Sequence, residues 1–392
     1  HFLYFTGLKT PELALLISPS GQETLYGAPP HEDEPVWSGA TASLAAQAEA
    51  AGIERIAPLA DLAPALARYK TVHFTAPYRD SERLWLAQLL GATPEAVREL
   101  ASESLAKAIV ALRSVKEEAE IAEIEEALSI TARMFESARA LIRPGSSEAA
   151  VRAAMLGVAA LYDRALAYEP ICSVRGEILH NPQCRNRLES GDLLLIDMGV
   201  ESPSHYASDI TRCYPVDARF NGRQREIYTL VWRVQEAIIA KAKPGVSYHE
   251  LHLLASRIFI EGLRQLGLMR GDGQEALAAG AHALFFPHGL GHMLGLDVHD
   301  MEDLGDLVGY EAGYARSPQF GLSYLRFARE LRPGFVVTVE PGIYFNPELI
   351  ARWRAANKHD AFINYERLAA YEGFGGVRVE DDILITEDGA RV

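Results

Sequence analysis

Short apolar runs alternate with turns and Ala-rich stretches over the first hundred residues. Residues 14–17 form a strand-like run, and Pro19-Ser20-Gly21 after it is a typical turn. The Ala-rich stretches at residues 40–51 and 81–90 predict helices. We therefore expect a small α/β domain at the amino end.

A longer helical stripe predicts where a second domain begins. Ser114 and Glu117 have the spacing of a capping box, so a helix is expected to begin there. The apolar positions behind them recur at helical spacing, at Ile121, Ile124, Leu128 and Phe135. Pro144-Gly145 ends the pattern. We therefore predict two domains, at residues 1–108 and 109–392.

Three Xaa-Pro-Gly tripeptides divide the second domain. They are Arg143-Pro144-Gly145, Lys243-Pro244-Gly245 and Arg332-Pro333-Gly334, and two of them follow long helical stretches. Because Pro and Gly end helices in any protein, the pattern fits an internal duplication and ordinary helix stops equally well.

Composition narrows the range of partners. Of 392 residues, 53 are acidic and 38 are basic, giving a formal charge of −15 that opposes binding to nucleic acid and to anionic membranes. No apolar stretch approaches the roughly 20 residues of a membrane helix. Cys172, Cys184 and Cys213 form no CxxC pair or disulfide framework, so we expect a cytoplasmic protein.

Acidic residues inside apolar, strand-like segments are the main chemical signal. There are four of them, Asp197, Asp209, Glu340 and Glu380. A buried charge is costly unless something compensates it. Gly199 and Pro203 predict a hairpin that brings Asp197 and Asp209 together, and a divalent cation would relieve their repulsion.

Histidines supply nitrogen ligands in the run Pro287-His288-Gly289-Leu290-Gly291-His292 and at His299. Carboxylates with one imidazole form a mostly oxygen site, which suits Mn, Mg, Co, Fe or Zn better than Cu. Each residue alone has an ordinary structural explanation; Glu340, for example, precedes Pro341 at a turn. Their joint occurrence favours a metal site.

Five segments together resemble the pita-bread metallopeptidases that include prolidases and aminopeptidases P. They are Leu195-Ile196-Asp197-Met198-Gly199, Ala207-Ser208-Asp209-Ile210-Thr211-Arg212, His288-Gly289-Leu290-Gly291-His292, Thr338-Val339-Glu340-Pro341-Gly342-Ile343-Tyr344 and Gly376-Val377-Arg378-Val379-Glu380-Asp381-Asp382. The opening Phe2-Leu3-Tyr4-Phe5-Thr6-Gly7 resembles the family's amino-terminal domain. The resemblance implies a mixed α/β (α+β) fold, in which a small α/β domain precedes an internally duplicated pita-bread catalytic domain, and a homodimer.

The resemblance also implies two divalent metal ions per subunit, with manganese favoured and cobalt or zinc as alternatives. Asp197 matches the ligand of one ion, His292 and Glu340 match ligands of the other, and Asp209 and Glu380 match the bridges. The family's substrate-side positions are matched by His180, Tyr344 and Arg378.

Three residues receive catalytic roles from the same resemblance. His288 or His299 would stabilise the tetrahedral intermediate, and Glu340 would carry the proton to the leaving nitrogen. The bond before proline is a tertiary amide without N–H, so two metal ions would activate the water and the carbonyl. Two features depart from the family: Asp197 and Asp209 are 12 positions apart, one more than usual, and residues 173–176 differ. The altered loop leaves open whether Tyr168 is the tyrosine found in some prolidases.

Arg326 decides between two substrates. It lies 14 positions before Glu340 and matches the arginine that binds the proline carboxylate in prolidases, so the main prediction is hydrolysis of Xaa-Pro dipeptides. If Arg326 is instead an ordinary surface arginine, the alternative is aminopeptidase P, which acts on longer peptides. Creatinase-like chemistry is disfavoured by the metal ligands, and methionine aminopeptidase by the amino-terminal domain. A peptide-binding module without catalysis is the non-enzyme alternative.

Overall fold

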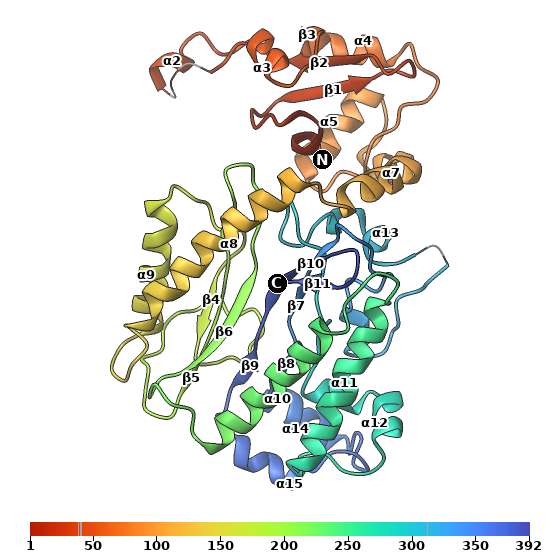
Figure 1. Ribbon diagram of the computed structural model, residues 1–392. Helices are drawn as coiled ribbons and strands as arrows, with labels where there is room; N and C mark the ends of the chain where they lie inside the picture. Colours follow the sequence, from red (N-terminus) through yellow and green to blue (C-terminus); the bar gives the residue numbers. More distant parts are fainter. Residues whose placement is uncertain (38, 40, 312) are drawn as a thin grey trace. The chain divides into compact units, whose positions relative to one another are not determined.

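The computed structural model describes residues 1–37, 39, 41–311 and 313–392, which divide into two compact units, His1–Ile109 and Val110–Val392 (Figure 1). Each unit has its own sheet structure and is described by itself. Among the described residues, no helix is long and apolar enough to cross a membrane. Their three cysteines are free thiols.

Unit 1 is built on a three-stranded sheet in the order β1-β2-β3. The antiparallel pair β1 (Leu13–Ile17) and β2 (Glu23–Gly27) is joined by β3 (Ile56–Pro58), which runs parallel to β2. The predicted strand at 14–17 and helix at 81–90 are confirmed, whereas helix α3 (Leu44–Ala50) begins after the cap Ser43; Ala40 lies outside the described residues.

The helices of unit 1 are short. They are α1 (Phe2–Thr6), α2 (Glu34–Trp37), α3, the turn η1 (Leu59–Asp61), α4 (Leu62–Leu66), α5 (Asp80–Leu90), α6 (Pro94–Leu100) and α7 (Glu103–Ser114), which continues past Ile109.

The predicted capping box at Ser114 and Glu117 is wrong by three residues. Ser114 ends α7, and the next helix, α8 (Glu118–Arg139), is capped by Glu117. Glu120 returns a hydrogen bond by accepting from the backbone N–H of Glu117 at 2.8 Å. Glu117 has the extended backbone that an N-cap requires, because a helix cannot continue backwards through that conformation.

The first half of unit 2 packs two helices on a sheet. Helices α8 and α9 (Glu148–Leu161) cover an antiparallel sheet ordered β4 (Ile171–Ser173), β5 (Leu193–Met198), β6 (Ile210–Pro215). On β5, Leu194 and Ile196 are fully buried in the core formed with α8 and α9. Because side chains alternate along a strand, Leu195 and Asp197 face the opposite side. This alternation directs the Asp197 carboxylate away from the helices.

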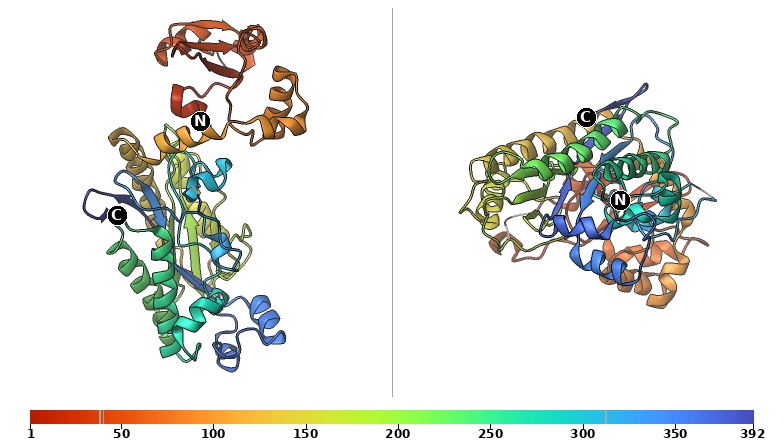
Figure 2. Two further views of the ribbon diagram at one scale, coloured as in Figure 1. Left: turned by 90° about the vertical axis from the view of Figure 1, so that its right-hand side faces the viewer. Right: turned by 90° about the horizontal axis from the view of Figure 1, so that it is seen from below.

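The second half repeats this arrangement with additional segments. Helices α10 (Gly222–Ile239) and α11 (Tyr248–Gln265) are followed by β7 (Val336–Val339), β8 (Gly342–Tyr344), β9 (Gly376–Arg378), β10 (Asp381–Ile385) and β11 (Ala390–Arg391). The strands form the sheets β11-β10-β7 and β8-β9. The right-hand view of Figure 2 shows α8 and α10 running along one side of the strands.

Shorter helices and turns connect these elements. They are α12 (Gly273–Ala279), η2 (Ala281–Leu284), η3 (Glu302–Leu304), α13 (Asp306–Gly309), η4 (Leu322–Tyr324), α14 (Pro347–Ala355), α15 (Tyr365–Leu368) and η5 (Ala369–Tyr371).

The two halves match in detail, which favours the internal duplication over ordinary helix stops. After α8, the backbone N–H of Gly145 donates to the carbonyl oxygen of Leu188 at 2.8 Å. After α10, the backbone N–H of Gly245 donates in the same way to the carbonyl oxygen of Leu331 at 3.0 Å. Both glycines have a positive φ, of 86° and 83°, which favours glycine over residues with a side chain. Equivalent turns therefore join the helices of each half and anchor the strand that follows.

Candidate metal centre

One cavity of about 900 Å³ in unit 2 collects every side chain that the sequence predicts for the site. These residues are His180, Asp197, Asp209, His288, His292, His299, Arg326, Glu340, Tyr344, Arg378 and Glu380. They come from segments up to 200 positions apart (His180 to Glu380), so only the fold brings them together.

Asp197 and Asp209 reach the cavity from a hairpin, as predicted. Strands β5 and β6 pair with Asp197 opposite Thr211. Asp209 lies two positions before Thr211 and therefore faces the same side of the sheet. The hairpin thus places the two carboxylates on a shared face.

Glu340 and Glu380 meet where two strand pairs join. Val339 pairs with Asp381 in one ladder and Gly342 pairs with Arg378 in the other, so either register places Glu340 opposite Glu380. Thr211 lies beside Glu380 and donates its hydroxyl hydrogen to Glu380 Oε2 at 2.6 Å. The second carboxylate pair is thereby tied to the first.

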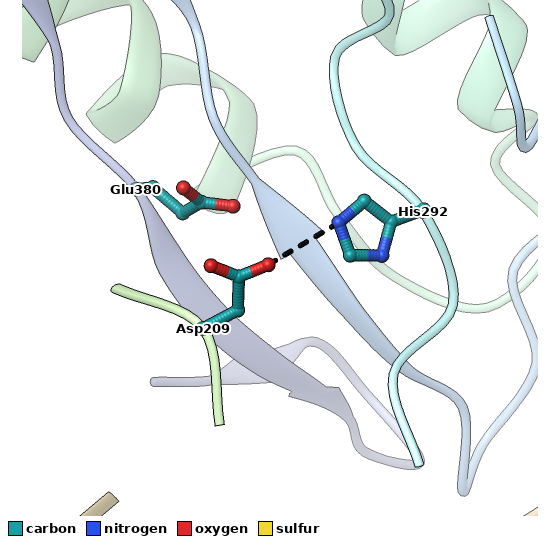
Figure 3. A group of neighbouring side chains, drawn as sticks. All are labelled: Asp209, His292 and Glu380. Carbon is teal, nitrogen blue, oxygen red and sulfur yellow. Dashed lines mark ion pairs between the residues drawn. The ribbon is translucent and has the colours of Figure 1, made fainter. Parts of the chain in front are cut away.

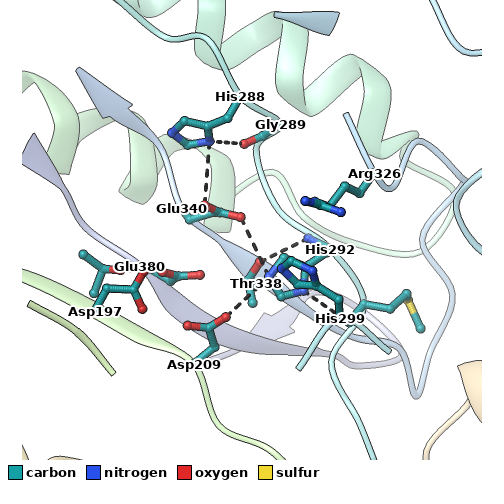
Figure 4. A network of polar contacts seen from close by, with 12 residues as sticks. Asp197, Asp209, His288, Gly289, His292, His299, Arg326, Thr338, Glu340 and Glu380 are labelled. Atoms are coloured by element: carbon teal, nitrogen blue, oxygen red, sulfur yellow. Dashed lines mark hydrogen bonds and ion pairs between the residues drawn. The ribbon is translucent and has the colours of Figure 1, made fainter. Parts of the chain in front are cut away.

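His292 is oriented as a ligand. Its segment runs beside β7, where the N–H of Thr338 donates to the carbonyl of His292 at 3.0 Å. The ring Nδ1 contacts the carbonyl of Met293 at 3.0 Å, which leaves Nε2 facing Asp209 Oδ2 at 3.4 Å and Glu340 Oε1 at 3.9 Å (Figures 3 and 4). A histidine whose Nδ1–H is held by a carbonyl presents the Nε2 lone pair to a metal.

The donor set fits a divalent cation. One ligand atom each from Asp209, His292 and Glu380 lies within 4.8 Å of the others, and these residues are only 6%, 3% and 2% exposed (Figure 3). Burial raises the pKa of Glu340 to about 7, and burial together with Asp209 raises the pKa of Glu380. Although burial opposes its charged form, contact with Asp209 raises the pKa of His292 to about 9. A divalent cation bound among these side chains would compensate the charge of the carboxylates.

Tyr168 belongs to the same cluster, and its match to the tyrosine of some prolidases stays a prediction. Its hydroxyl lies 2.6 Å from both Asp197 Oδ1 and Asp209 Oδ1. The hydroxyl has one hydrogen, so the two carboxylates share it. Tyr168 lies three positions before β4, whose Ile171 pairs with Asp197, and this position places it beside the ligands.

Neighbouring polar groups hold the ligands in place. Arg378 forms an ion pair with Asp197, the backbone N–H of Asp209 donates to Asp382 Oδ2 at 3.0 Å, and that of His292 donates to Thr338 Oγ1 at 3.1 Å. Thr338 and Asp382 lie inside two of the family-like segments, but no sequence pattern assigns either of them a role.

A chain of hydrogen bonds runs from Arg378 through Tyr344 to His288. Arg378 Nη1 donates to the Tyr344 hydroxyl at 3.1 Å, and that hydroxyl lies 2.8 Å from His288 Nε2. Because a guanidinium can only donate, the Tyr344 hydroxyl accepts from Arg378 and donates its own hydrogen to His288 Nε2. His288 Nδ1 then carries the ring hydrogen and donates it to the carbonyl of Gly289 at 2.7 Å. Burial, together with Arg378, lowers the pKa of His288 to about 3, so its ring is neutral. Its predicted role towards an intermediate stays a prediction.

His180 and His299 also line the cavity. His180 is exposed, and burial of its surroundings together with Arg378 lowers its pKa. The ring of His299 lies 4.2 Å from that of His292, centroid to centroid. Burial and His292 lower the pKa of His299, although its Nδ1 lies 3.3 Å from Glu302 Oε2.

Arg326 lines the cavity but already has a carboxylate partner. Its Nη1 donates to Glu302 Oε2 at 2.5 Å, the same oxygen that contacts His299 (Figure 4 shows Arg326 and His299). Glu302 lies outside the recognisable motifs and was not predicted for the site.

Comparisons with known sequences agree with this geometry. Residues 122–387 match metallopeptidase family M24, and residues 1–74 match the aminopeptidase P N-terminal domain. Two fungal proteins, each named a probable Xaa-Pro aminopeptidase, are 33% identical to this chain over 99% of its length. The match covers 82% of the protein from Fusarium vanettenii and 83% of the protein from Penicillium rubens. Human Xaa-Pro dipeptidase is 42% identical over 202 residues, 52% of this chain and 40% of the human one.

Solved structures of aminopeptidases P match the whole chain in three dimensions. A variant of Escherichia coli aminopeptidase P matches with a TM-score of 0.80 and 30% identity, covering 100% of this chain and 84% of that one. Pseudomonas aeruginosa aminopeptidase PepP matches with a TM-score of 0.80 and 28% identity over the same shares. The predicted fold class, a small α/β domain before a pita-bread catalytic domain, is thus confirmed. The chain belongs to metallopeptidase family M24 and begins with an aminopeptidase P-type amino-terminal domain.

Proposed function

We propose that this chain is a metal-dependent Xaa-Pro aminopeptidase, which removes the first residue from peptides whose second residue is proline. The observation that carries the proposal is the full-length likeness to proteins named Xaa-Pro aminopeptidase and to aminopeptidase P structures. The main prediction from sequence, a dipeptidase, rests on Arg326 reading a substrate carboxylate. Its pairing with Glu302 supports the aminopeptidase alternative instead.

The cavity suits a bond whose nitrogen has no hydrogen. A prolyl amide cannot be held by an N–H contact at the scissile nitrogen, so activation must act on the water and on the carbonyl oxygen. Divalent cations at Asp197, Asp209, His292, Glu340 and Glu380 would supply that activation as Lewis acids.

The surrounding residues then divide the remaining work. Glu340, with a pKa of about 7, is proposed to hold a proton at its carboxylate and to pass it to the leaving nitrogen. Arg378 and Tyr344 fix the ring of His288 on one wall. His299, held at Nδ1 by Glu302, presents its other nitrogen for the substrate.

A dipeptidase is the second candidate, because human Xaa-Pro dipeptidase shares 42% identity over 202 residues. Rates of the manganese-loaded enzyme on Xaa-Pro-Yaa peptides and on Xaa-Pro dipeptides separate the two. We expect kcat/KM to be higher for the longer peptides. A clear preference for dipeptides would reverse the order of the candidates.

Two expectations from the family resemblance also stay predictions. Elemental analysis of the purified protein should find two divalent ions per subunit, and sedimentation should find a homodimer. Protein that binds no divalent cation would favour the peptide-binding module instead.

A further inference from the structure

A single carboxylate oxygen connects the wall of the substrate cavity to the residues behind it. Glu302 Oε2 accepts from Arg326 Nη1 at 2.5 Å and lies 3.3 Å from His299 Nδ1. Arg326 lines both the main cavity and a smaller one of about 210 Å³, whereas Glu302 lines only the smaller one. Glu302 therefore approaches Arg326 from behind, and the guanidinium stands between it and the main cavity.

The backbone next to Glu302 is anchored by neighbouring contacts. Met301 before it has a φ of 61°, a left-handed conformation that side chains adopt only under local constraint, and Glu302 then begins the turn η3. One position further back, Asp300 forms buried ion pairs with Arg113 at 2.6 Å and Lys116 at 2.9 Å. An anchored backbone makes the contact between Glu302 and Arg326 a built feature of the site.

This contact changes what Arg326 can recognise. A free arginine at the cavity wall attracts a substrate carboxylate through charge-assisted hydrogen bonds. Here the guanidinium is already neutralised, and a second carboxylate arriving there would also meet the negative charge of Glu302. A dipeptide ending in proline carries its carboxylate directly after the proline, whereas a longer peptide carries an uncharged amide there.

We propose that Glu302 determines specificity: by occupying Arg326, it selects against Xaa-Pro dipeptides and for longer Xaa-Pro-Yaa peptides. This inference rests on the proposed function, since it concerns the substrates of that same site. Glu302 acts through Arg326 and is a positioning residue. Replacing its charge should expose Arg326 to a substrate carboxylate and should shift the enzyme towards dipeptides.

The test is the ratio of kcat/KM for a dipeptide to kcat/KM for the matching tripeptide, measured on the manganese-loaded full chain. Glu302→Gln keeps the size and an oxygen acceptor but removes the charge, and it should raise this ratio about 10-fold or more, the range of one charged hydrogen bond. Effects transmitted through His299 act on both substrates and cancel in the ratio. The control Glu311→Gln removes a carboxylate that pairs with exposed Arg332 and should leave the ratio unchanged.

Arg326→Ala completes the cycle. In the wild-type background it should change the ratio less than about 3-fold, since Arg326 is already paired, whereas in the Glu302→Gln background it should remove the whole gain. An unchanged ratio in Glu302→Gln, or a gain that survives loss of Arg326, overturns the proposal. If Glu302→Gln does not fold, a selective loss of dipeptide hydrolysis in Arg326→Ala alone overturns it. Wild-type preference for dipeptides would defeat the proposed function, while the direction of the ratio shift would still decide the role of Glu302.

Discussion

The two halves of unit 2 supply the same carboxylates but different selecting residues. Asp197 lies four positions after the start of β5 and Glu340 four positions after the start of β7. Asp209 directly precedes β6, as Glu380 directly precedes β10. The repeated strands thus bring matched pairs of carboxylates to one cavity.

The connecting segments differ much more. In the first half, residues 162–192 add Tyr168 and His180 to the cavity wall. In the second half, residues 280–335 add the proposed ligand His292 and three further residues of the cavity wall, His288, His299 and Arg326. The same segment adds Glu302, which lines only the smaller cavity behind Arg326. The repeated framework therefore gathers carboxylates in one cavity, while the unrepeated segments supply the residues that we propose to contact the substrate.

The largest expected effect comes from the equivalent pair Asp209 and Glu380. Asp209→Asn and Glu380→Asn should each abolish hydrolysis and lower the metal content towards one ion or none, because each is assigned to bridge both ions. Elemental analysis with activity measurements tests this. Asp197→Asn should retain more metal, since its matching position serves one ion. Equal metal loss in all three variants would contradict the assignment of bridging and single-ion ligands, and unequal loss in the Asp209 and Glu380 variants would contradict the equivalence between the halves.

His299, from the unrepeated segment, should matter for turnover and not for the metal. His299→Ala should keep the full metal content and lower kcat on the order of 100- to 1000-fold, the cost of losing one donor near the reacting atoms. Elemental analysis and steady-state kinetics on the same preparation check both parts. Metal loss in this variant would instead make His299 a ligand.

Buried His282, also in the unrepeated segment, should make the stability of the fold sensitive to acid. Burial lowers the pKa of His282 to about 4, and neither ring nitrogen has a hydrogen-bond partner in the described part of the chain. Below pH 6.5 His282 binds a proton in the unfolded chain, whereas in the folded protein it stays neutral until the pH approaches 4. The free energy of unfolding therefore decreases as the pH falls from about 6.5 to 4. At pH 5 this loss should be about 2 kcal/mol.

His282→Phe should remove that loss. Urea unfolding of the metal-free protein at pH 8 and pH 5 measures it, with His73→Gln, an exposed histidine of unit 1, as the control. If the stability of His282→Phe falls with pH as much as that of the wild type, the buried ring is not the source.

The smallest expected effect concerns Tyr344. Tyr344→Phe removes the hydroxyl between Arg378 and His288 and should lower kcat/KM about 10-fold, the range of a lost buried hydrogen bond, with both metals retained. The control Tyr314→Phe alters an exposed tyrosine outside the cavity and should have no effect. Unchanged kinetics in Tyr344→Phe would show that His288 needs no such support.

The sequence by itself determined the fold and the residue types of the metal centre. Charged residues inside apolar strands are so costly that Asp197, Asp209, Glu340 and Glu380 stand out without a structure. The turns at Gly145 and Gly245 fit a repeat, but the sequence pattern fits ordinary helix stops equally well. Local patterns of this kind depend on neighbours within a few positions. The helix start was less certain, because Ser114 and Glu117 both lie near the boundary and only the backbone at Glu117 is extended.

Only the tertiary structure decided how the charges pair. Arg326 and Glu302 are 24 positions apart, and Tyr168 and Asp209 are 41 apart, so no periodicity or motif links them. Whether an arginine faces a substrate or a carboxylate of its own chain depends on where connecting segments pack, since side-chain contacts across such distances follow from the fold. The sequence therefore identifies a member of metallopeptidase family M24, while the ion pair that we propose to set its preference between a dipeptide and a longer peptide is visible only in the folded chain.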